Sequence, residues 1–155
     1  MTELQQDTYL DPSEATGAAF VARGIEGPVV MLNLLRFRDV ADYSAFLQLA
    51  PPQPISGREA YERYIEHTLP FLRASGGDLL YVGSGGDYLI GPPGRGWDLA
   101  MLVRQRSADS FLAFASDAEY LAGLGHRVAA VRDSRILPLV DAMPASAAAL
   151  GSIRT

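Results

Sequence analysis

Residues 29–37, Val29-Val30-Met31-Leu32-Asn33-Leu34-Leu35-Arg36-Phe37, decide the fold of this chain. Gly27 and Pro28 break the segment before them, and the residues that follow are apolar at both odd and even positions. Successive side chains of a strand point to opposite faces of a sheet, so this strand needs cover on both faces. We expect helices to cover one face and a second apolar surface to cover the other.

The segments that follow this strand predict a β-α-β-β-α-β order. Ser56-Gly57-Arg58-Glu59 forms a capping box, which opens a helix from Arg58 to about Ala74. The later elements are expected as a strand over 78–91 kinked at 83–86, a strand over 97–105, a helix after Ser107, a broken helix from Tyr120 to about Asp133, and a strand over 135–140. This order predicts an α+β, ferredoxin-like domain with an antiparallel sheet.

Both ends of the chain lie outside this pattern. Asp11 and Pro12 suit the N-cap and first position of a short helix that Gly24 ends. The alanine-rich segment from Met143 has no core pattern. We therefore expect an N-terminal helical extension over 1–27, a ferredoxin-like domain over 28–140, and a mobile C-terminal tail over 141–155.

Composition excludes several classes of chemistry. The chain has 155 residues, no cysteine and two histidines, and all 13 of its basic residues are arginine. Disulfides, thiolate catalysis and lysine Schiff bases are thereby excluded, and we expect neither a metal nor a cofactor. The net charge of −5 argues against a nucleic-acid partner. No apolar run could span a bilayer and no signal peptide is visible, so a cytoplasmic protein without a membrane partner is expected.

The second face of the predicted sheet indicates a partner. Helices cover only one face of a ferredoxin-like sheet, yet the 29–37 strand is apolar on both. A second copy of the chain offers the same apolar face, and the two sheets would close into a barrel. We therefore expect a homodimer.

Four segments resemble a known family. They are Val30–Phe37, Ser56–Tyr64, Ile90-Gly91-Pro92 with Trp97-Asp98, and His126–Arg135. In this order, over roughly residues 28–140, they resemble the domain-of-unknown-function family 1330, which belongs to the dimeric α/β-barrel group. The resemblance implies a ferredoxin-like fold and dimerisation, and it implies no particular reaction.

Two residues are candidates for catalysis. Asn33 is a polar amide within an apolar strand, so it either binds a substrate oxygen in a cavity or ties strands or subunits together. His126 has the only side-chain type that titrates near neutral pH, and it either moves a proton or is an ordinary boundary histidine. Asp133 lies seven residues further on, about 10 Å along a helix, which is too far for a His–Asp dyad. Asp133 is expected to fix a turn through arginine or backbone N–H partners.

Four residues are candidates for substrate binding. Tyr64 either donates to a ligand oxygen or packs in the core, and Arg127 either holds an anionic group or forms a salt bridge. Trp97 is either a ligand contact or a packing anchor. Arg36 either contacts the ligand or pairs with Asp133 or Asp98.

The sequence leaves three functions open. The first is a small-molecule-binding protein, or a cofactor-independent enzyme, acting on a small carbonyl- or carboxylate-bearing compound. The second is a non-enzymatic structural or interaction dimer. The third is a haem-degrading-monooxygenase-like protein, because those enzymes use an asparagine, a tryptophan and a histidine in the order in which Asn33, Trp97 and His126 occur here.

Overall fold

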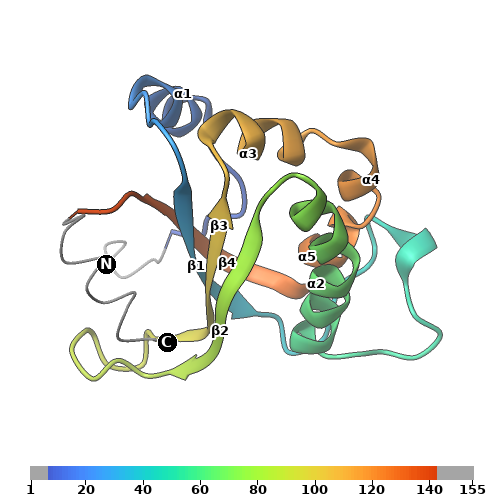
Figure 1. Cartoon of the computed structure of the whole chain (residues 1–155). Helices are drawn as coiled ribbons and strands as arrows, with labels where there is room; N and C mark the ends of the chain where they lie inside the picture. Colours follow the sequence, from blue (N-terminus) through green and yellow to red (C-terminus); the bar gives the residue numbers. More distant parts are fainter. Residues whose placement is uncertain (1–6, 143–155) are drawn as a thin grey trace, which may run out of the picture.

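The sheet has the strand order β2-β3-β1-β4, and all neighbouring strands are antiparallel. This computed structural model describes residues 7–142 (Figure 1). Its elements are α1 (Glu14–Ala22), β1 (Val29–Phe37), the 3₁₀ turn η2 (Leu47–Leu49), α2 (Gly57–Ala74), β2 (Asp78–Gly86), β3 (Trp97–Gln105), α3 (Ala108–Ala115), α4 (Ala118–Leu121), α5 (Leu124–Ala130) and β4 (Val131–Leu139). The order and pairing confirm the predicted α+β, ferredoxin-like fold.

Strand β1 lies in the middle of the sheet and divides the molecule into two faces. Its odd-numbered residues, from Val29 to Phe37, are buried, and its even-numbered residues are half-buried. The odd face lies under the helices, where Leu35 and Phe37 pack against side chains of α2 and α5. On this inner face Asn33 is paired with Met101 of β3 and Ile136 of β4. The even positions form an outer face that no helix of residues 7–142 covers.

Helix α2 supplies most of the cover on the inner face. Ser56 and Glu59 form the predicted capping box, with hydrogen bonds of 3.0 and 3.2 Å between each side chain and the other residue's backbone N–H. A side chain on Gly57 would overlap the backbone carbonyl of Arg38, so only glycine fits where the helix meets this loop. The helix buries a stripe at helical spacing. Its buried members beyond the first turn are Tyr61, Tyr64, Thr68 and Leu72.

The C-terminal part of the chain corrects one prediction. The helix expected to reach Asp133 ends at Ala130, and β4 begins at Val131 rather than Arg135. Asp133 therefore lies in a strand, opposite Arg36 of β1. The β-branched Val131 suits a strand, and pairing with Phe37 determines where β4 begins.

Three further boundaries differ from the sequence prediction. Ser13, not Asp11, is the N-cap of α1, because its side chain accepts a hydrogen bond from the Thr16 N–H at 3.0 Å. Strand β2 ends at Gly86, and its irregularity lies between Leu79 and Tyr81 rather than in the glycine-rich stretch at 83–86. The sequence of residues 42–47 is compatible with a helical turn, but in the structure only Leu47, the first residue of η2, is helical. Of the predicted C-terminal tail, residues 143–155 lie outside the described residues.

The N-terminal segment is attached to the domain. The Ser134 N–H donates to the Tyr9 carbonyl at 2.9 Å, and the Tyr9 N–H donates to Asp133 Oδ1 at 2.9 Å. These bonds cover the outer edge of β4, which would otherwise present unpaired groups. Phe20 of α1 contacts Phe111 of α3 edge to face, with centroids 5.9 Å apart. None of the helices in the described part of the chain has the length and apolarity needed to span a bilayer.

Candidate ligand-binding site

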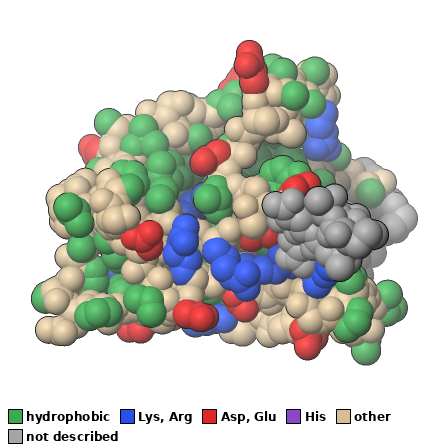
Figure 2. Space-filling view, turned by 180° about the vertical axis from the view of Figure 1, so that it is seen from behind, with side chains coloured by type: hydrophobic (Ala, Val, Ile, Leu, Met, Phe, Trp, Pro, Cys, Tyr) green, Lys and Arg blue, Asp and Glu red, His purple; other side chains and the backbone are tan. Residues whose placement is uncertain are grey.

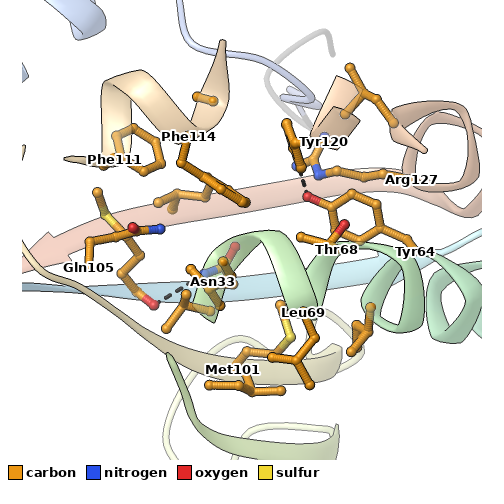
Figure 3. Close-up of a pocket in the computed structure, with 18 of the residues that line it drawn as sticks. Asn33, Tyr64, Thr68, Leu69, Met101, Gln105, Phe111, Phe114, Tyr120 and Arg127 are labelled. Atoms are coloured by element: carbon orange, nitrogen blue, oxygen red, sulfur yellow. Dashed lines mark hydrogen bonds between the residues drawn. The ribbon is translucent and has the colours of Figure 1, made fainter. Parts of the chain in front are cut away.

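A cavity of about 280 Å³ lies between the inner face of the sheet and the helices (Figure 3). Its walls are mostly apolar, with Met31 and Met101 from the sheet and Leu69, Phe111 and Phe114 from the helices. Leu10 and Pro12 also line it, so the N-terminal segment forms part of its wall. This volume and this apolar lining are typical of a site for a small organic ligand.

The cavity has one end that is rich in hydrogen-bond donors. The Tyr64 and Tyr120 hydroxyls bond to each other at 2.8 Å, and Thr68 and Arg127 lie at the same end (Figure 3). Burial, and then the neighbouring hydroxyls of Tyr120 and Tyr61, raise the pKa of Tyr64 well above its ordinary value. The Tyr64 phenol therefore stays neutral at physiological pH, and it can donate a hydrogen bond but cannot serve as a base there.

Arg127 brings a positive charge to this end. Its Nη1 donates to the Leu10 carbonyl at 2.9 Å and its Nη2 to Ser134 Oγ at 3.2 Å. Both acceptors are neutral, and no carboxylate of residues 7–142 forms a salt bridge with Arg127. Asp11 is the one acidic residue among the described residues that line the cavity, and it is exposed. The guanidinium is thus held in position by neutral groups and keeps its charge uncompensated.

The opposite end contains a buried amide that the sequence analysis missed. Gln105 is 2% exposed, and its Oε1 has no hydrogen-bond partner within residues 7–142. Thr68 Oγ1, at the donor-rich end, is likewise buried and has no partner in the described part of the chain. Asn33 lies between the two ends, where its Nδ2 donates to the Met31 carbonyl at 3.1 Å (Figure 3). The signal for Gln105 was available, because it is a polar residue at the end of an apolar strand.

No family model matches the sequence, and no curated protein matches it. A solved structure of methylated RPA0582 protein is 33% identical, with a TM-score of 0.77, and covers 88% of this chain and 97% of its own. The chain belongs to the family of RPA0582. A second structure, of RPA0582 from Rhodopseudomonas palustris, is described as a protein of unknown function. It is 33% identical, with a TM-score of 0.75, and the match covers 89% of this chain and 100% of the RPA0582 chain. A dimeric ferredoxin-like protein of unknown function from Thermobifida fusca is more distant, at 17% identity and a TM-score of 0.44, covering 74% of this chain and 92% of its own.

Three of the predicted site residues meet at the cavity of this RPA0582-family chain, and three do not. Asn33, Tyr64 and Arg127 line it. His126 does not, and its Nδ1 is instead 2.8 Å from the Tyr43 hydroxyl. Burial, and then the positive charges of Arg63 and His67, lower the pKa of His126, which favours a neutral imidazole. His126 is therefore placed to fix α5 against the loop that carries Tyr43.

Arg36 and Trp97 belong to a second cluster, around Asp133. Arg36 Nη1 donates to Asp133 Oδ2 at 2.7 Å, and its guanidinium lies 3.9 Å from the Trp97 ring centroid. Arg36 Nε also donates to the Gly96 carbonyl at 2.8 Å, which ties the β2–β3 loop to the sheet. The predicted pairing of Arg36 with Asp133 is present. Arg36 and Trp97, together with Arg135 and Tyr9, line a shallow open hollow. Arginine side chains gather among hydrophobic ones in the view from behind (Figure 2).

Asp133 is the centre of this cluster. Burial alone would raise the pKa of its carboxyl, but the Tyr9 N–H, Arg135 and Arg36 together lower the pKa below the ordinary 3.8. Arg135 Nη1 lies 2.6 Å from Asp133 Oδ1. Asp133 thus has the arginine and backbone N–H partners that the sequence analysis expected for it.

The set of residues behind the haem hypothesis is dispersed. Asn33 lines the cavity, Trp97 donates to the Tyr88 hydroxyl at 2.6 Å in the second cluster, and His126 bonds to Tyr43. Asn33 lines the inner cavity and Trp97 the outer hollow, and His126 lines neither. Within residues 7–142 no group of three or more His, Asp or Glu side chains is arranged to hold a metal ion.

Proposed function

We propose that this protein binds a small, largely apolar carboxylate in the cavity between its sheet and its helices. The uncompensated charge of Arg127 at the donor-rich end carries this proposal, because a guanidinium with free capacity pairs well with a carboxylate. The Tyr64–Tyr120 pair and the Thr68 hydroxyl supply further donors for the same group. The methionine, leucine and phenylalanine walls favour an apolar body.

We infer binding rather than catalysis for this site. Tyr64 has a raised pKa, and His126, the proposed proton carrier of the sequence analysis, lies outside the cavity. General acid–base catalysis needs a group that titrates near the working pH and reaches the substrate. Asn33 then acts as a polar contact for the ligand body, and Arg36 and Trp97 act as structural residues of the second cluster.

We also propose that the protein is a homodimer, with the outer sheet face as its interface. This face carries the half-buried even residues of β1, together with Leu137 at 55% exposure and Tyr81 at 60%. An exposed apolar sheet face needs a partner, and a second copy presents a matching surface without requiring any other protein. The cavity lies on the opposite face of the sheet, so dimerisation and ligand binding are compatible. The assignment to domain-of-unknown-function family 1330 stays a prediction from the four segments.

Isothermal titration calorimetry with para-methylphenylpropanoate tests the proposed function. The Arg127→Gln variant is expected to bind this probe at least tenfold more weakly, because a charge-assisted pair is lost. Leu69→Trp is expected to block binding by filling the cavity. Arg63→Gln, an exposed arginine on α2 outside the cavity, is the matched control and should bind as the wild type does. Equal affinity for wild type and Arg127→Gln would contradict the proposal.

A further inference from the structure

We propose that the ligand carries a hydroxyl group at the end opposite its carboxylate, and that this hydroxyl binds the buried amide of Gln105. This inference rests on the proposed function and adds the identity of the ligand's second polar group. It concerns the apolar end of the cavity, where Gln105 is the polar side chain that lies deepest within the wall (Figure 3).

The first observation is that the Gln105 amide oxygen is buried and accepts no hydrogen bond from the described residues. The residue is 2% exposed, and its Oε1 has no partner among the described residues. A buried amide without a partner destabilises a folded protein, so polar groups in protein interiors are almost always hydrogen-bonded. The amide is directed into the cavity rather than into solvent. A bound ligand is therefore the group that would satisfy it.

The second observation is the placement of Gln105 relative to Arg127. Gln105 is paired with Val29 at the start of β1, and Asn33 lies four residues further along that strand, about 13 Å at the usual rise. Arg127 bonds to Ser134, which is paired with Leu35, still further in the same direction. The two polar ends are thus separated by the length of the cavity. Both side chains line the same cavity, so one ligand can contact both ends.

The third observation is the chemistry of the amide itself. A carboxamide offers both an acceptor oxygen and a donor nitrogen at nearly the same place. A hydroxyl can donate to the first and accept from the second, so it matches the amide in either orientation. A methyl group at that position would leave the amide facing an apolar surface, which costs binding free energy.

The test compares two probes that differ at one group. We expect wild-type protein to bind para-hydroxyphenylpropanoate at least tenfold more tightly than para-methylphenylpropanoate in isothermal titration calorimetry. Gln105→Met, which keeps side-chain length, should remove this preference while still binding the methyl probe. Gln105→Leu serves as a second variant with the same expectation. Gln48→Leu, at an exposed position on η2, is the matched control and should retain the preference.

The outcomes separate this inference from the proposed function. If wild type binds both probes equally, or if Gln105→Met retains the preference, the hydroxyl assignment is wrong and the carboxylate site stands. If neither probe binds, both proposals fall together. Thr68→Val gives a further check, since it lies at the donor-rich end and should weaken both probes by the same factor. If Thr68→Val loses the preference for the hydroxyl probe, the ligand hydroxyl binds at the donor-rich end rather than at Gln105, and the inference is wrong.

Discussion

Replacing Asp133 by asparagine should destabilise the folded protein substantially. The Asp133 side chain is 2% exposed, and Arg36, whose side chain is 11% exposed, lies 2.7 Å away. Removing one charge of a buried pair typically costs about 3–5 kcal/mol, because the other charge is left without its partner. The Arg135 side chain is 39% exposed and can turn to solvent, so losing its salt bridge with Asp133 adds little to the cost in stability. We therefore expect the lower end of the range, about 3 kcal/mol.

The size of the effect can be measured by heat or by urea. For a chain of this length, about 3 kcal/mol corresponds to a fall in Tm of roughly 6–12 °C. Urea unfolding should show a lower midpoint with an unchanged slope, since the surface exposed on unfolding is the same. Asp87→Asn, at an exposed loop position, is the control and should leave both quantities within error of wild type.

The same pair makes stability depend on pH in a defined direction. The folded-state pKa of Asp133 lies below its ordinary value of 3.8, so folding favours the ionised carboxyl. This contribution is fully present above about pH 5, and it is lost as the pH falls below 3.8 towards the folded-state pKa. The stability difference between wild type and Asp133→Asn should therefore shrink in acid. A difference that stays constant down to acid unfolding, or one below about 1 kcal/mol at pH 7, would refute the ion-pair account.

Three further predictions follow from the same structure. Gln105→Met should raise the Tm of the unliganded protein by roughly 2–8 °C, because a buried unpaired amide costs about 1–2 kcal/mol; a lower Tm would show that the amide is satisfied. Leu32→Glu on the outer face should convert the proposed dimer to a monomer in analytical ultracentrifugation, whereas an unchanged mass would contradict the proposed interface. His126→Ala should leave the affinity for para-methylphenylpropanoate unchanged in calorimetry, since His126 does not line the cavity. A tenfold loss of affinity would show that His126 contributes to the binding site.

The fold was accessible from the sequence because its signals are local. The apolar run on both faces of β1 predicts that strand, and the Ser56–Glu59 capping box predicts the start of α2. Each prediction needs only a few neighbouring residues. The boundary between α5 and β4 was not accessible in this way. Residues 131–134 have the charged composition of a helix end, but pairing with β1, nearly a hundred residues earlier, makes them a strand. Tertiary contacts override local propensity at such positions.

The candidate site was accessible only in part, for the same reason. Asn33 and Tyr64 stand out as polar groups in apolar patterns, and the structure brings them to one cavity with Arg127. His126 has an equally suggestive sequence position, yet it belongs to α5 and packs against Tyr43. Which polar residues converge depends on helix orientation, which spacing along one chain does not report. The absence of a salt-bridge partner for Arg127 among the described residues likewise becomes visible only in three dimensions.

A crystal structure of the protein with para-hydroxyphenylpropanoate tests the central claim most directly. The account predicts the ring between α2 and the inner face of the sheet, and the carboxylate within hydrogen-bond distance of the Arg127 guanidinium. The same structure would show the hydroxyl group beside the Gln105 amide. A probe bound on the outer face, or one whose carboxylate lies away from Arg127, would contradict it.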